Sequence, residues 1–121
     1  MARYRLSATA RADIIAILAW THEHFGVTAR VRYETLLVTA LRDIAHQPTR
    51  PGSLERPELG EHVRSWHLGL SRDRARTDAG IVRRPRHFLI YRLDAELVVV
   101  GRVLHDAMEL TRHLEPEEPW E

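Results

Sequence analysis

The chain has 121 residues, of which 44% are hydrophobic and 29% charged, with a formal net charge of +1. This length and composition predict one soluble globular domain with a single core. The absence of cysteine excludes disulfides and thiolate metal sites and is compatible with a reducing compartment. No apolar run approaches the ~20 residues of a membrane span, and no apolar segment of signal-peptide type begins the sequence, so we expect no membrane partner.

The charges are unevenly placed, and every basic residue apart from histidine is an arginine. From Arg72 to Arg92 seven arginines stand against two aspartates, a net charge of +5. From Asp106 to Glu121 six acidic residues stand against one arginine, a net charge of −5. This polarity is compatible with self-shielding, with a nucleic-acid face or with a site for an acidic partner.

The N-terminal part predicts a strand followed by two helices. Residues 3–6 alternate as in a short strand, and Ser7 is suited to cap a helix over residues 8–24. Gly26 is suited to end that helix. The apolar face of this first helix comprises Ile14, Ile17, Leu18 and Phe25, widened by Ile15.

A second helix is predicted over residues 28–46, directly after the first. Its apolar stripe comprises Tyr33, Leu37, Ala40, Leu41 and Ile44, with Leu36 beside it. Two amphipathic helices with so short a link should form an antiparallel αα-hairpin. Residues 47–60, with three prolines and two glycines, predict a connector within the domain.

The C-terminal half predicts strands and an arginine-rich loop. Residues 61–70 alternate as in a strand, and residues 71–85 are polar and predict an exposed loop with at most one helical turn. The runs 87–93 and 97–104, joined by Asp94–Glu96, predict a β-hairpin. Both faces of this hairpin are largely apolar, which is typical of strands near the middle of a covered sheet.

Residues 105–114 could form a final short helix, and residues 115–121 (EPEEPWE) predict an acidic, disordered tail. The predicted order is therefore β-α-α-β-β-β. It indicates an α+β fold, in which an antiparallel helical hairpin packs on a small, mainly antiparallel β-sheet. The domain would span residues 1–114.

The residue patterns give little support for a metal site or for common catalytic machinery. The eight histidines include no HExxH motif and no compact ligand set. The serines lack a nucleophile-elbow context, and the scattered glycines form no phosphate-binding loop. We therefore expect no metal and no cofactor, and we assign no catalytic residue.

The basic stretch and its neighbouring strands are the candidate binding site. Arginines can clamp phosphates or carboxylates, and a histidine and a tyrosine could move protons. The candidates are Arg72, Arg74, Arg76, Arg83, Arg84, Arg86, His87, Tyr91, Arg92, Arg102 and His105. For each arginine alone a solvated surface position is the simpler interpretation, with Arg92 paired to Asp94 or Glu96. For the cluster as a whole we favour a binding role.

Three stretches, taken together, resemble a known family. They are Tyr4–Ile17 (YRLSATARADIIAI), Leu41–Gly52 (LRDIAHQPTRPG) and Arg84–Leu110, which contains YR, a short turn, and then RVLH followed three residues later by Met108. In this order they resemble the ParE toxins of bacterial type II toxin–antitoxin modules, within the RelE/ParE superfamily.

The resemblance implies a cytoplasmic toxin that inhibits DNA gyrase and is neutralised by a ParD-like antitoxin in a hetero-oligomeric complex. Such a toxin would not be an enzyme. One alternative is a RelE-like, ribosome-dependent mRNA endoribonuclease, for which His87, Tyr91, Arg83 and His105 have suitable chemistry. Another is a degenerate toxin that survives only as a binding module. Met108, which belongs to the motif that resembles the family, is added to the candidate antitoxin- or target-binding residues.

Two arginines inside the hairpin require partners, because arginine is seldom buried unpaired. Arg92 is compatible with an ion pair to Glu96 or with a partner contact. Arg102 follows three valines and has no acidic neighbour nearby in sequence. We therefore expect Arg102 to pair with a carboxylate from elsewhere in the fold or from the antitoxin.

Overall fold

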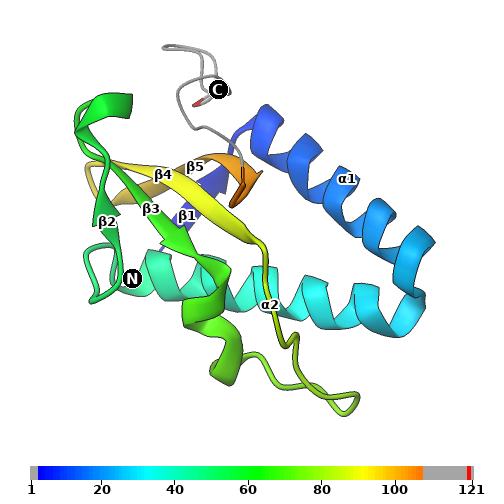
Figure 1. Ribbon diagram of the computed structural model, residues 1–121. Helices are drawn as coiled ribbons and strands as arrows, with labels where there is room; N and C mark the ends of the chain where they lie inside the picture. Colours follow the sequence, from blue (N-terminus) through cyan, green and yellow to red (C-terminus); the bar gives the residue numbers. More distant parts are fainter. Residues whose placement is uncertain (1–2, 108–119, 121) are drawn as a thin grey trace.

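The computed structural model describes residues 3–107 and 120, and it has a helical hairpin on one face of a five-stranded sheet (Figure 1). The elements are β1 (Arg3–Leu6), α1 (Ala8–Phe25), α2 (Val27–His46), β2 (Leu54–Glu55), β3 (Val63–His67), β4 (His87–Asp94) and β5 (Leu97–His105). Two short 3₁₀ segments, Pro57–Leu59 and Leu68–Arg74, flank β3. The predicted α+β class and element order are confirmed, with the two-residue β2 added inside the predicted connector.

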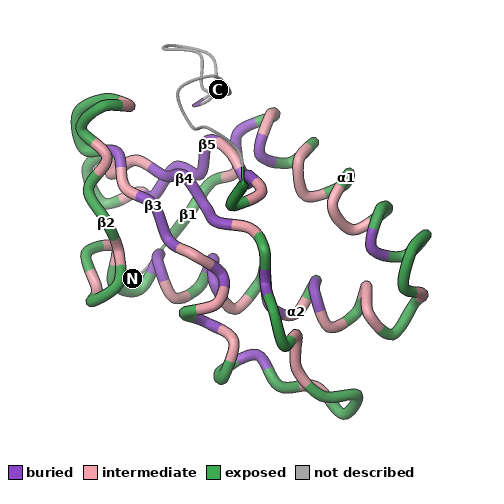
Figure 2. Tube along the Cα trace, viewed as in Figure 1, coloured by how far each residue is buried: buried purple, intermediate pink, exposed green. Residues whose placement is uncertain are grey.

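The sheet has the order β1-β5-β4-β3-β2, so the predicted hairpin β4–β5 is at its centre. All strand pairs are antiparallel except β1–β5, which is parallel; the long chain between these two strands permits this pairing. A register shift beside Ile90 leaves Gly101 as the extra residue of a bulge in β5. Both faces of the hairpin are buried, as its composition predicts (Figure 2).

The two faces of the sheet belong to different apolar clusters. The inner face, under the helices, contributes Leu89, Tyr91, Val98, Val100 and Val103 to the main core. The outer face contributes Val63, Phe88, Ile90, Val99 and Leu104 to a second cluster that also contains Trp120. Alternate residues of each strand point to opposite faces, so the nearly continuous apolar runs supply both clusters.

The helices use their predicted apolar faces only in part. All six predicted stripe residues of α2 are buried in the core. On α1, Ile14, Ile17 and Leu18 pack against the core, but Phe25 and Ile15 are 68% and 64% exposed, so their predicted burial was wrong. Phe25 is exposed because the α1–α2 junction extends away from the sheet (Figure 1), whereas Ile15 lies in the middle of α1 on the side that faces away from the core.

The start of α1 is fixed to β5 by polar groups. Ser7 caps the helix by accepting from the Ala10 N–H at 3.0 Å, and its hydroxyl donates to the Gly101 carbonyl at 2.9 Å. Asp13 accepts two hydrogen bonds from the Arg102 guanidinium, at 2.7 and 3.1 Å, and one from the Val103 N–H at 2.9 Å. The expected carboxylate partner of Arg102 therefore comes from within the fold.

Other boundaries differ from the predicted ones. The strand predicted over residues 61–70 begins only at Val63, because His62 has a left-handed backbone (φ 63°). It ends at His67, where the 3₁₀ segment begins; its Ser71 accepts from the Trp66 indole and donates to Asp43. The predicted last helix would begin at His105, but His105 ends β5. The rest of that helix, Met108, the boundary at 114 and all of the predicted tail except Trp120 lie outside the described residues.

Within the described part of the chain, no helix is long and apolar enough to cross a membrane.

Removing the Asp13 carboxylate should destabilise the fold. Asp13→Ala removes two hydrogen bonds from the half-buried Arg102 guanidinium and the acceptor of the Val103 N–H, so we expect a loss of about 2–4 kcal/mol in unfolding free energy. Chemical denaturation measures it. The matched control is Glu34→Ala, which removes an exposed helical ion pair with Arg30 and should cost less than about 0.5 kcal/mol. Equal losses in both variants would contradict this role of Asp13.

Candidate functional site

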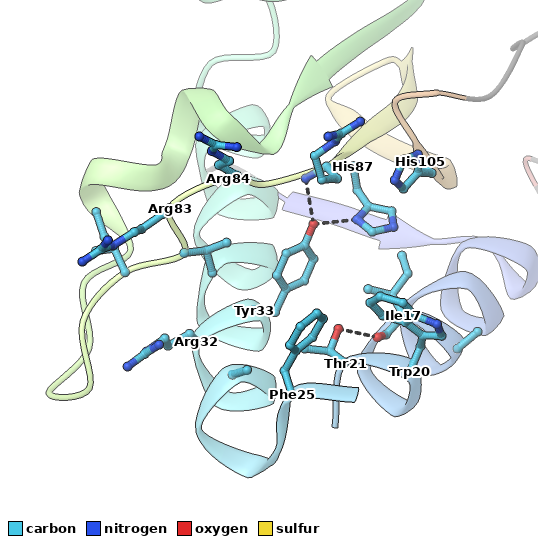
Figure 3. A pocket seen from close by; sticks show the side chains of 15 residues that line it. Ile17, Trp20, Thr21, Phe25, Arg32, Tyr33, Arg83, Arg84, His87 and His105 are labelled. Carbon is cyan, nitrogen blue, oxygen red and sulfur yellow. Dashed lines mark hydrogen bonds between the residues drawn. The ribbon is translucent and has the colours of Figure 1, made fainter. Parts of the chain in front are cut away.

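An open groove lies between the helical hairpin and the segment before β4, with a volume of about 900 Å³ (Figure 3). Helix α1 forms one wall and α2 the other, and residues 81–86 close one side. The lining residues are Ala16, Ile17, Trp20, Thr21, Phe25, Ala29, Arg32, Tyr33, Ile81, Val82, Arg83, Arg84, Arg86, His87 and His105. We call this feature the hairpin groove.

The end of the hairpin groove at the helical junction is apolar and aromatic. Trp20 and Phe25, which are 54% and 68% exposed, meet with their ring centroids 5.6 Å apart. His24 stacks on Trp20 with a centroid distance of 4.2 Å. These rings hold one another on the surface, which is unusual for aromatic side chains of this size without a binding role.

The opposite end of the groove is polar and contains Tyr33, His87 and His105 (Figure 3). The Tyr33 oxygen lies 2.5 Å from His87 Nδ1 and also accepts from the Arg86 backbone N–H at 3.3 Å. Either the phenol donates to Nδ1 or a protonated Nδ1 donates to the phenol oxygen, according to the tautomer of His87. The rings of His87 and His105 meet edge to face, with centroids 5.3 Å apart.

The two titratable groups of this pair are both held neutral at pH 7. Burial, and then the nearby charge of His105, lower the pKa of His87 to about 4. Burial raises the pKa of Tyr33 to about 12, although the Arg86 N–H bond opposes this. A neutral imidazole and a neutral phenol therefore form the polar end of the groove.

Asp106 anchors the strand ends next to this pair. It accepts from Arg86 Nε at 3.1 Å and lies 3.1 Å from His67 Nε2. Burial opposes ionisation of the carboxyl, but the hydrogen bonds from His67 and Arg86 outweigh it and hold the pKa of Asp106 below its usual value. The carboxylate thus fixes the side chain of Arg86 at the edge of the groove.

The structure separates the sequence-predicted site residues into two groups. Arg83, Arg84, Arg86, His87 and His105 line the hairpin groove, and the three arginines are exposed at its edge. Arg72 is adjacent, since it donates to the Arg83 carbonyl at 2.9 Å. Met108 lies outside the described residues.

The remaining predicted site residues are used elsewhere in the fold. Arg102 pairs with Asp13, and Arg74 donates to both oxygens of Asp43. Tyr91 is fully buried, and its hydroxyl donates to the Pro48 carbonyl at 2.5 Å. Arg92 stacks on Trp120 on the outer face, and among the described contacts it forms no ion pair with Asp94 or Glu96. These four residues, and Arg76, which is exposed outside the groove lining, are therefore not brought into the groove.

Arg74 is held by its ion pair with Asp43. Burial alone would raise the pKa of this carboxyl, but hydrogen bonds from Arg74 and Ser71 lower it below the usual value, with support from the charge of Arg50. The cluster joins α2 to the 3₁₀ segment before the arginine-rich loop.

Comparison with protein families identifies the chain. A family model described as "ParE toxin of type II toxin-antitoxin system, parDE" matches residues 4–110. The chain belongs to the ParE toxin family. A comparison with individual curated proteins found no match. The match covers every helix and strand of the structure except the first residue of β1, so the fold described above is that of a ParE-family toxin.

Sequence reasoning missed several groove residues of this ParE-family toxin. Tyr33 was assigned only to the α2 stripe, and Trp20 and Arg32 were not singled out. Arg32 lines the groove and its Nε is buried without a hydrogen-bond partner among the described residues. The sequence did contain one indication of the groove: Trp20 is a large aromatic residue outside the predicted apolar face of α1, so it is not needed for the core. In the described part of the chain, no cluster of potential ligands could hold a metal ion.

The low pKa of His87 predicts a pH-dependent stability. The unfolded chain protonates this imidazole near pH 6.5 and the folded chain near 4, so stability is lost as pH falls between these values. The contribution should reach about 1–2 kcal/mol, discounted for partial exposure. His87→Asn, which keeps an acceptor for Tyr33, should flatten the dependence in denaturation experiments from pH 7 to pH 4. The control His22→Asn removes an exposed imidazole on α1; if it flattened the curve equally, His87 would not be the source.

Proposed function

We propose that this ParE-family toxin inhibits DNA gyrase by binding it, and that a ParD-like antitoxin neutralises the toxin by docking in the hairpin groove. The observation that supports the docking site is the combination of a mainly apolar groove with exposed arginines at its edge. An amphipathic segment with acidic residues complements such a surface, because its apolar side chains fill the groove and its carboxylates pair with the arginines. The uneven charge distribution of the chain is compatible with an acidic partner, and in this proposal that partner is the antitoxin.

The aromatic end of the groove supplies anchors for such a segment. Trp20 and Phe25 are already positioned by their ring contacts, so little side-chain freedom is lost when a partner covers them. Arg32 offers a guanidinium inside the groove whose Nε lacks a described partner. A carboxylate from the antitoxin would satisfy it and add specificity.

We further propose that gyrase inhibition involves no catalysis by the toxin. General acid–base catalysis works best with pKa values near the working pH. His87, at about 4, and Tyr33, at about 12, are both far from neutrality. Tyr91, the other candidate of the nuclease hypothesis, is held in the core by the Pro48 carbonyl. These features favour a binding protein acting in the cytoplasm, where gyrase is found.

The RelE-like endoribonuclease is kept as the second candidate because two imidazoles face each other beside arginines. His87 and His105 lie together at the groove edge with Arg86, an arrangement that could contact a phosphodiester. The discriminating experiment is cell-extract translation with primer extension. Codon-specific mRNA cleavage that is lost in His87→Ala/His105→Ala would establish the nuclease, whereas intact mRNA together with blocked supercoiling supports the gyrase inhibitor.

Truncating the aromatic anchor should weaken antitoxin binding. Trp20→Ala removes the indole from the groove without opening the core, so we expect at least a tenfold loss of affinity for the antitoxin encoded next to the toxin gene, with little change in melting temperature. Titration calorimetry measures the affinity. Ile15→Ala is the matched control, because this side chain is 64% exposed and outside the groove. A groove that is not the antitoxin site would give equal affinities.

Gyrase inhibition can be tested directly with purified components. The toxin in stoichiometric excess should block gyrase supercoiling of plasmid DNA, and prior addition of the antitoxin should restore it. Unchanged supercoiling at that excess would refute gyrase as the target. Arg84→Glu at the groove edge should reduce antitoxin rescue, whereas Arg42→Glu, with the same charge change at an exposed site on α2 outside the groove, should not.

A further inference from the structure

The outer face of the sheet, opposite the helices, holds an aromatic side chain from the far end of the chain. Trp120 is only 6% exposed and packs in the cluster of Val63, Phe88, Ile90, Val99 and Leu104. Trp120 follows β5 in the sequence and is not part of the sheet, and its side chain covers an apolar face that would otherwise meet water.

Two arginines hold Trp120 in place. The strand register puts Arg5, Val99, Arg92 and Val63 in one row across β1, β5, β4 and β3. The Arg92 guanidinium carbon lies 4.9 Å from the centroid of the indole, a cation–π contact. Arg5 Nη2 donates to the Trp120 backbone carbonyl at 2.7 Å. This row, the tryptophan socket, thus has an apolar floor between two cations.

The sequence around Trp120 matches the charge of the socket. Its stretch, EPEEPWE, contains four glutamates and no basic residue. Arg3 is two residues before Arg5 in β1 and so shares its face, which adds a third cation near the socket. Acidic residues beside a tryptophan therefore favour this face over the less basic surfaces of the molecule.

We propose that the tryptophan socket is a binding site for a tryptophan flanked by acidic residues, that Trp120 fills it in cis, and that a peptide of the same kind competes for it in trans. Trp120 belongs to none of the strands and is held in the socket by apolar packing, the Arg92 contact and one hydrogen bond from Arg5, so a peptide that presents the same groups can take its place. While Trp120 is seated, the socket is closed to partners. The site is on the opposite face from the hairpin groove, so it does not depend on the proposed antitoxin docking.

The test uses the full-length Trp120→Ala chain and a fluorescein-labelled heptapeptide of sequence EPEEPWE. Fluorescence anisotropy should show saturable binding to the variant and at least tenfold weaker binding to the wild-type chain, whose socket is filled. The peptide EPEEPAE should not bind. Ile15→Ala is the control: it removes an exposed apolar side chain of α1 outside the hairpin groove and should leave peptide binding as weak as in the wild type.

The socket residues provide the second arm. In the Trp120→Ala background, Arg92→Ala should weaken peptide binding at least threefold, since the cation–π contact is lost. Equal binding to the wild type and to Trp120→Ala, or equal binding of EPEEPWE and EPEEPAE, would overturn the proposal. Unchanged peptide binding on adding Arg92→Ala to Trp120→Ala would also overturn it.

A second measurement covers the case in which Trp120→Ala does not fold. The wild-type chain labelled with 5-fluorotryptophan gives fluorine resonances for its three tryptophans, assigned by single Trp→Phe variants. Excess unlabelled EPEEPWE should move the Trp120 resonance toward the position of the free amino acid and leave that of the buried Trp66 unchanged. A Trp120 resonance that stays in place at peptide saturation would show a permanent core residue and no exchangeable site.

Discussion

The contact between Asp13 and Arg102 is the constraint on which the arrangement of the two layers depends. It lies where β1 has ended, so β5 has lost its strand neighbour on that side and the Val103 N–H needs another acceptor. The Asp13 carboxylate supplies that acceptor from α1 and is neutralised by Arg102. Together with Ser7, which bonds to Gly101, it fixes the start of α1 over β5. The wall of the hairpin groove and the position of His105 follow from this geometry.

The arginines of this chain have two different roles. Arg74 and Arg102 stabilise the fold through carboxylates on the helices, whereas Arg83, Arg84 and Arg86 are exposed at the edge of the groove. The two groups of arginines differ in whether a helix carboxylate lies close enough to pair with them. Asp43 pairs with Arg74 and Asp13 with Arg102. Among the described contacts, no helix carboxylate pairs with an arginine of the loop before β4. Of these three edge arginines, Arg86 is the one that pairs with Asp106 among the described contacts. The positive edge therefore remains available to an acidic partner.

The neutral pair Tyr33–His87 gives the groove its chemical character. Burial keeps both groups neutral, so the polar end of the groove orients its neighbours through hydrogen bonds and does not repel an apolar segment. The outer face of the sheet shows the same logic, with an apolar floor between cations. The molecule thus offers two mainly apolar surfaces edged by arginine, one lying open and one filled by Trp120.

The sequence by itself determined the class, the helical hairpin, the central β-hairpin and the family, because periodicity and short phrases are local properties. It also indicated that Arg102 needs a carboxylate, since arginine is seldom buried unpaired and no acid lies near it in sequence. Only the tertiary structure decided which carboxylate serves, that Phe25 and Ile15 are exposed, and that Tyr91 is in the core while Tyr33 meets His87. These outcomes depend on how far α1 and α2 extend past the sheet and on which residues distant in sequence meet. Such distances are set by the mutual position of the two layers, which no local pattern encodes.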